Sequence, residues 1–150
     1  MKENFDYRDA VEHILLENDI KFMRDDHEDT AIFALPMFAK NVPVLRIFFS
    51  VSEEGDCKFH SYFTRDLSEK KIPTMLRTIN RLNSEYRYIT MSIDSDGDVL
   101  AAYDFMLFGN DPKTLSQSVM TTFMPVCNIM DKCIKPVMKI VWLDNDDEED

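Results

Sequence analysis

The sequence predicts an α+β fold in which helices pack on one face of an antiparallel sheet, in the order α-β-β-β-α-β-β-α. Two observations favour this fold. Apolar residues alternate with period two in some segments, whereas they recur every three or four residues near the start, after the middle and near the end of the chain. Short hairpin turns rather than long crossovers join the predicted strands, which indicates antiparallel pairing.

The first part of the chain predicts a helix followed by β structure. The helix is expected over residues 7–16, with Asp6 as its cap. Residues 20–23 look like a short strand, in addition to the three strands that are expected before the second helix. Residues 31–38 form a β-rich run that contains Pro36. Because proline cannot donate to a ladder, we expect this strand to lie at a sheet edge or to break there.

Residues 44–52 show the clearest alternation in the chain. One face of this strand would carry Leu45, Ile47, Phe49 and Val51, and the other face Val44, Arg46, Phe48 and Ser50. Residues 53–56 predict a hairpin turn. The strand is then expected to return over residues 58–64, with Phe59, Ser61 and Phe63 pointing inward.

The next elements are a helix and two more strands. Residues 70–86 carry a helical pattern, and Pro73 is tolerable only in a first turn, which places the start of the helix near Ile72. Strands are expected at residues 87–93 and 98–107.

A long helical segment is expected to complete the fold. Asp111 would cap it and Pro112 would lie in its first turn, whereas Pro125 and Pro136 should kink or divide it. Residues 144–150 contain no core-forming side chains and should be a disordered acidic tail. Residues 1–143 are therefore predicted to form a single domain.

The charge and hydropathy of the chain exclude two classes of partner. The formal net charge is −11, and no concentrated basic patch is present, so we expect no binding to nucleic acid. The N-terminus is acidic and has no uninterrupted apolar stretch, and no segment approaches the roughly 20 apolar residues that span a bilayer. We therefore expect a cytoplasmic protein without membrane contact.

No motif gathers residues for chemistry, so we predict no enzyme, no cofactor and no bound metal. Cys57, Cys127 and Cys133 show no CxxC spacing and are interpreted as reduced thiols that fill space as small apolar groups. Cys57 and His60 lie three apart on a strand and would point to opposite faces. One alternative stays open, namely a small-ligand, metal or enzymatic site assembled from loops near His27.

The acidic stretch DSDGDVLAAYDF, residues 94–105, fails the test for a calcium loop. An EF-hand needs glycine at position 6 and a bidentate glutamate at position 12, and these positions hold Val99 and Phe105. The flanking residues alternate with period two instead of forming helices. The stretch therefore predicts a β-hairpin in which Gly97 adopts a positive φ and the aspartates bind local amides.

The same region resembles a known family. The stretch LNSEYRYITMSIDSDGDVLAAYDF, residues 82–105, is similar to the signature region of the YbjN family: a helix ending in Leu-Asn, a strand, an Asp-Gly hairpin and a Val-x-Ala-x-Tyr-Asp strand. The order of elements also matches over most of residues 6–142. The resemblance implies a fold like that of type III secretion chaperones, which are small, acidic, cytoplasmic and usually dimeric. It also implies a non-enzymatic protein with a regulator- or chaperone-like role.

The sheet face that points away from the core is predicted to be unusually apolar. It would carry Val44, Arg46, Phe48, His60, Tyr62, Tyr88, Leu100, Ala102 and Met106. A solvated antiparallel face normally carries polar residues, so either a helix of the same chain covers this face or the face is an interface. We expect a homodimer that captures an unidentified protein on this face or between its C-terminal helices. The expected contact residues are Phe48, Tyr62, Tyr88 and Leu100.

Overall fold

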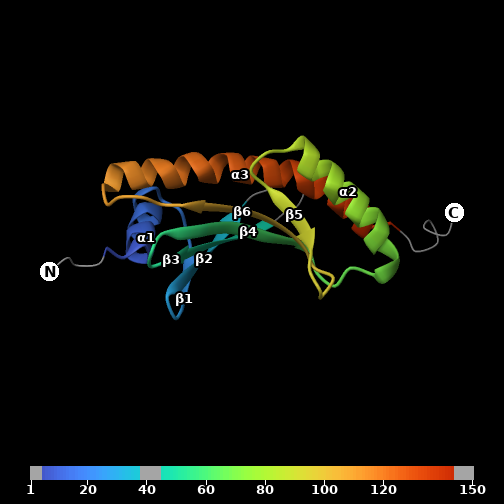
Figure 1. The fold of residues 1–150 in the computed structure, drawn as a ribbon, viewed down its shortest axis with the longest axis horizontal. Coiled ribbons are helices and arrows are strands. Elements are labelled where there is room, and N and C mark those ends of the chain that lie inside the picture. The colour runs from blue at the N-terminus through green and yellow to red at the C-terminus, as the bar shows by residue number, and fades with distance from the viewer. Residues whose placement is uncertain (1–4, 38–44, 144–150) are drawn as a thin grey trace.

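The computed structural model of the chain describes residues 5–37 and 45–143 (Figure 1). Its elements, in chain order, are α1 (Tyr7–Glu17), β1 (Met23–His27), β2 (Thr30–Met37), β3 (Leu45–Ser52), β4 (Asp56–Thr64), the 3₁₀ turn η1 (Glu69–Lys71), α2 (Ile72–Glu85), β5 (Thr90–Ile93), β6 (Val99–Met106) and α3 (Pro112–Val141). None of the described helices combines the length and the apolar character needed to cross a bilayer.

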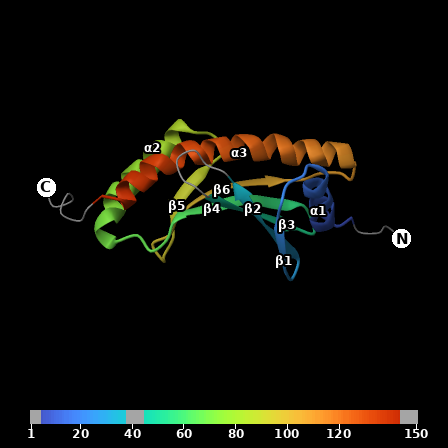
Figure 2. The ribbon, with the colours of Figure 1, turned by 180° about the vertical axis from the view of Figure 1, so that it is seen from behind.

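The six described strands form one antiparallel sheet in the order β1-β2-β3-β4-β6-β5. The helices lie on one side of it. The long α3 runs over the sheet, while α1 lies toward one end of α3 and α2 toward the other, beside β5 (Figures 1 and 2). The predicted α+β class, with an antiparallel sheet and helices on one face, is confirmed.

The first strand differs from the prediction. β1 begins where the short strand at residues 20–23 was expected to end, so four strands rather than three precede α2. The strand is polar and largely exposed. Arg24 turns toward α1, and its guanidinium contacts the carboxylates of Asp9 and Glu12 at 3.0 and 3.2 Å. A charged edge strand has no apolar alternation, so the sequence pattern could not indicate it.

Pro36 does not place its strand at the edge of the sheet, because β2 lies between β1 and β3. β1 pairs with β2 only as far as Ala34. Pro36 therefore lies beyond the end of β1, where its missing N–H removes no hydrogen bond between these two strands.

The core lies between the sheet and the helices and is built around aromatic rings. Phe49 and Phe59, cross-strand neighbours on β3 and β4, are fully buried and stack with ring centroids 4.2 Å apart. Phe105 of β6 stacks on Phe59 at 5.5 Å, and Phe123 of α3 approaches the same ring at 5.6 Å. The predicted inward residues Ile47, Phe49, Val51, Phe59, Ser61 and Phe63 are all buried. Val44 and the side chain of Leu45 lie outside the described part of the chain.

A kink or a division was expected at Pro125 and Pro136, and the division is wrong, because α3 is continuous over 30 residues. The two prolines lie eleven residues apart, close to three helical turns, and therefore on one side of the helix. A separate stripe of buried residues runs from Leu115 to Ile140 and faces the core. Burial of this stripe outweighs the two missing hydrogen bonds. The helix curves along its length instead of breaking (Figure 1).

A buried lysine joins the start of α2 to the end of α3. The Nζ of Lys71 donates to the carbonyl oxygens of Val141 and Leu143, both at 2.7 Å. Carbonyls at a helix C-terminus lack intrahelical donors and attract positive charge. Lys71 therefore fixes the end of α3 against α2.

Gly55, in the turn between β3 and β4, is expected to reject a side chain. Its φ is +101°, and a Cβ there would lie 2.9 Å from the carbonyl oxygen of Leu107 and 3.3 Å from ring carbons of Tyr7. Gly55→Ala should lower the free energy of unfolding by about 1–3 kcal/mol, measured by urea denaturation. Gly109→Ala is the matched control, because Gly109 has φ +74° but no neighbour within 4 Å. Equal losses in both variants would show that the contact with Leu107 has no effect.

Candidate functional site

The sheet face opposite the helices is uncovered within the described part of the chain (Figures 1 and 2). We call it the open face. Its central side chains are mostly apolar and half-buried: Ile32, Ala34, Phe48, His60, Tyr62, Leu100 and Ala102. The register brings them together, because Phe48 pairs with His60 on β4, and Tyr62 pairs with Leu100 on β6. A contiguous apolar surface of this kind is typical of a binding site.

A hollow of about 520 Å³ lies on the open face, toward β1. We call it the Phe48 hollow. It is lined by Met23, Arg24, Asp25, Ile32, Ala34, Arg46, Phe48, His60 and Tyr62. At its edge Met23 is 79% exposed, which is unusual for an apolar side chain. The volume suits one or two large side chains of a partner or a small ligand.

Three aromatic rings line the Phe48 hollow. Phe48 and the imidazole of His60 stack with ring centroids 5.3 Å apart. Tyr62 meets His60 edge to face at 6.1 Å. Beyond the hollow, the guanidinium carbon of Arg65 lies 3.9 Å above the ring of Tyr62 and holds it by a cation–π contact. The rings are therefore fixed in place before any partner arrives, which lowers the entropy cost of binding.

The imidazole of His60 contacts both of the other rings. Burial lowers its pKa below the ordinary value, Lys58 lowers it further, and Asp104 opposes this shift. The imidazole is therefore neutral at pH 7. Its Nδ1 is buried and has no hydrogen-bond partner among the described residues.

Three of the four predicted contact residues, Phe48, Tyr62 and Leu100, lie together on the open face. Period-two alternation was the signal that found them. Their role in binding a partner stays a prediction. No sequence pattern indicated Arg65, which lies after the end of β4. Met23 ends the short strand expected at residues 20–23, but its place on the open face was not predicted.

The predicted position of Tyr88 on this face is wrong. Tyr88 precedes β5, has φ +76°, and contacts the ring of Tyr103 edge to face at 5.7 Å. Tyr103 pairs with Phe59 and therefore faces the helices. Both tyrosines line a notch of about 100 Å³ beside Pro125 of α3. Period-two counting failed because β5 begins only at Thr90, after this residue.

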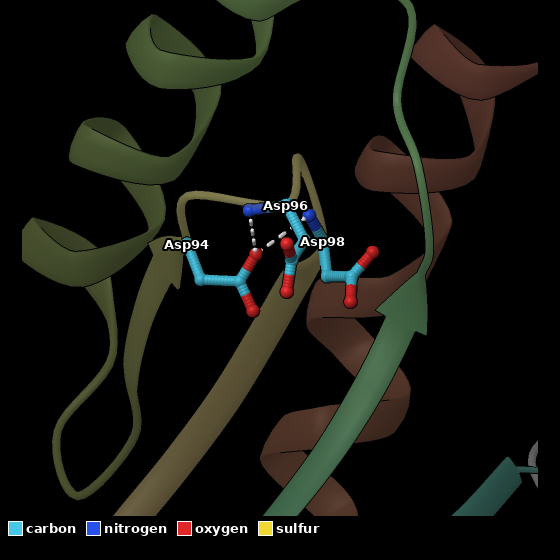
Figure 3. A group of neighbouring side chains, drawn as sticks. All are labelled: Asp94, Asp96 and Asp98. Carbon is cyan, nitrogen blue, oxygen red and sulfur yellow. Dashed lines mark hydrogen bonds between the residues drawn. The ribbon is translucent and has the colours of Figure 1, made fainter.

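Three carboxylates gather at the turn between β5 and β6, as Figure 3 shows. Asp94, Asp96 and Asp98 could each offer an oxygen within 4.8 Å of the others. Local hydrogen bonds explain this arrangement: Oδ1 of Asp94 accepts from the backbone N–H groups of Asp96 and Asp98, both at 3.0 Å, and Asp98 accepts from that of Asp66 at 2.8 Å. Gly97 has φ +80°. The predicted hairpin is confirmed, and the absence of a bound metal stays a prediction.

The described residues bring no third potential metal ligand to the alternative site near His27. His27 ends β1 at the surface, and its Nε2 lies 2.9 Å from Oδ2 of Asp25. Within residues 5–37 and 45–143, the aspartate turn is where three potential metal ligands converge, and His27 does not belong to it.

The three thiols are buried and unpaired. Burial raises the pKa of Cys57 and of Cys127 to about 12 and that of Cys133 to about 11. All three are therefore protonated at pH 7 and poorly nucleophilic. Cys57 faces the core while His60 faces outward, as predicted, so they form no nucleophile–base pair.

Comparison with known families shows to which family the chain belongs. The family described as "YbjN: Putative bacterial sensory transduction regulator" matches residues 7–127. The chain belongs to the YbjN family. A search of curated proteins found no match. The family description supports a regulatory or binding protein.

Solved structures are also similar to this YbjN-family chain. The crystal structure of YbjN from E. coli, titled "a putative transcription regulator", has a TM-score of 0.58 at 10% identity, covering 88% of this chain and 91% of that chain. An uncharacterized protein from Methanothermobacter thermautotrophicus has a TM-score of 0.45 at 13% identity, covering 86% and 97%. At 10% identity, the likeness to YbjN from E. coli shows a common fold.

Proposed function

We propose that this YbjN-family protein is a non-enzymatic regulatory protein that acts in the cytoplasm by binding proteins, without a cofactor, and that one partner is a second copy of itself. The open face carries this proposal. It presents aromatic and aliphatic side chains that no described helix covers, and a hollow large enough for a partner's side chains. The family description as a regulator supports action through binding rather than through catalysis.

The open face has the composition of an interface. Phe48, Tyr62 and Leu100 lie at the apolar centre of the face, while Lys58 and Asp104 lie toward a polar rim. Each large apolar side chain that leaves water contributes on the order of 1.5–3 kcal/mol. An apolar centre with a polar rim is the usual composition of a protein interface.

Replacing Phe48 or Tyr62 by aspartate is expected to weaken self-association at least tenfold, because the interface would bury an unpaired carboxylate in place of an aromatic ring. Sedimentation velocity over a concentration series measures this change. Phe108→Asp is the matched control, since Phe108 is 74% exposed in the loop between β6 and α3. If both face variants are folded by circular dichroism and still associate like the unmodified chain, the open face is not the interface.

A further inference from the structure

We propose that the C-terminal segment of one copy, from Trp142 to the acidic end of the chain, docks on the open face of a second copy. This inference rests on the proposed function, because it names the part of the second copy that the open face binds. The side chain of Trp142 would enter the Phe48 hollow, and the acids that follow would lie against the arginines beside it.

The first observation concerns the end of α3. Trp142 is 66% exposed and Leu143 is 42% exposed, although both are large apolar residues at the end of a helix whose buried stripe is well packed. An exposed tryptophan next to an exposed leucine is typical of an anchor for a partner surface. Six acids follow within seven residues: Asp144, Asp146, Asp147, Glu148, Glu149 and Asp150. The segment therefore combines an aromatic anchor with a strong negative charge.

The second observation concerns the charge around the Phe48 hollow. Arg46 lines the hollow and forms no ion pair with another described residue. Arg65 lies over Tyr62 at its border, where its guanidinium also pairs with the carboxylate of Asp98 at 3.7 Å. Asp25 also lines the hollow, and its Oδ2 lies 2.9 Å from Nε2 of His27. In a chain of net charge −11, Arg46 makes this end of the open face the less acidic one, which favours an anion here.

The opposite end of the open face has a different character. There Lys58 lies in a group that also contains Asp29, Asp56 and Asp104. Acids outnumber the cation in that group, so an acidic segment would be repelled from it. The charge therefore gives the docking a direction, with the acids directed toward Arg46 and Arg65.

The third observation explains why the segment must come from another copy. Lys71 binds the carbonyl oxygens of Val141 and Leu143, which holds Trp142 at the end of α3. This helix packs on the covered side of the sheet (Figures 1 and 2). Trp142 therefore ends a helix that packs on the side of the sheet away from the open face of its own molecule. In a twofold pair, each copy can give one segment and receive one.

Deleting residues 144–150 and changing Arg46 to glutamate are each expected to weaken self-association at least tenfold in sedimentation velocity. Trp142→Ala should weaken it by a similar factor. Lys58→Glu is the matched control, because it reverses a cation on the same face but at the acidic end, and a change of less than threefold is expected. Raising the salt from 50 to 500 mM should also weaken association of the unmodified chain, since the arginines and the acids are screened.

A peptide of residues 141–150 gives a direct test. The receptor is the chain that lacks residues 144–150 and carries Trp142→Ala, so the peptide holds the sole tryptophan of the mixture. Its fluorescence emission should shift to shorter wavelength and saturate on titration, as expected for an indole that leaves water. A peptide with its acids changed to Asn and Gln should bind at least tenfold more weakly. The receptor with Phe48→Asp added should give no shift.

The outcomes separate this inference from the proposed function. If Phe48→Asp abolishes self-association but the deletion, Arg46→Glu and Trp142→Ala do not, and the peptide does not bind, the inference is overturned while the open face remains the interface. If Phe48→Asp and Tyr62→Asp also leave association unchanged, both proposals are overturned. If Arg46→Glu and Lys58→Glu weaken self-association equally, the net charge alone explains the effect, and the inference is overturned.

Discussion

Replacing Phe59 by alanine is expected to lower the free energy of unfolding by about 3–5 kcal/mol. Phe59 is fully buried, and its ring lies 4.2 Å from that of Phe49, 5.5 Å from that of Phe105 and 5.6 Å from that of Phe123. The substitution removes contacts with two neighbouring strands and with α3 at once. The paired strands on each side cannot move in to fill the space, so most of the ring volume remains as a cavity.

Urea denaturation measures this effect, and Phe48→Ala provides the matched control. Phe48 is a phenylalanine on the neighbouring strand, but it lies on the open face and is half-buried. Its replacement is expected to cost the monomer about 1–2 kcal/mol. A loss for Phe59→Ala no larger than that for Phe48→Ala would contradict the position of the core on the helix side of the sheet.

Alkaline pH is expected to destabilise the protein strongly. The folded pKa values of Cys57 and Cys127 are raised to about 12 and that of Cys133 to about 11, because burial disfavours the thiolate. Below about pH 9 these thiols are protonated in both states, and their contribution to stability is fully present. Above pH 9 the unfolded chain releases its thiol protons first, so this stability is lost as the pH rises toward 11–12. The loss is on the order of 1.4 kcal/mol per pH unit for each thiol.

The free energy of unfolding, measured in urea between pH 7 and 11, checks this dependence. The single variants Cys57→Ala, Cys127→Ala and Cys133→Ala should each flatten the decline above pH 9 by up to a third. Their losses at pH 7, which come from small cavities, serve as the baseline for each variant. A decline with an unchanged slope in all three variants would mean that the thiols do not cause the alkaline sensitivity.

The fold could be predicted for those elements that place only one of their two faces against the core. Residues 44–52 and 58–64 alternate clearly, so both the strands and their inward side chains followed from the pattern. β1 could not be found in this way, because its backbone pairs with β2 while its side chains stay mostly in water. The continuity of α3 could not be predicted from local sequence rules either. Proline weakens a helix locally, but the buried stripe that sustains α3 depends on a sheet formed by distant residues.

The candidate site was predictable in part for the same reason. Phe48 and Tyr62 follow from alternation, and their proximity follows from the hairpin between their strands. Tyr88 was misplaced because no local signal marks the residue at which β5 begins. Arg65 could not be found, since its position over Tyr62 depends on the path of the chain after β4. The cation–π contact belongs to the tertiary structure rather than to a sequence pattern.

The two outer strands of the sheet determine what kind of assembly the molecule can join. β1 has the sequence Met-Arg-Asp-Asp-His, and β5 at the other edge is four residues long. Charge on one border and brevity on the other discourage further strands from adding by backbone pairing, which is how sheets grow into filaments. Both edges therefore discourage the addition of further strands to the sheet. A sheet face, by contrast, can bind no further partner once it is occupied. A chain built in this way favours small closed complexes over open-ended polymers.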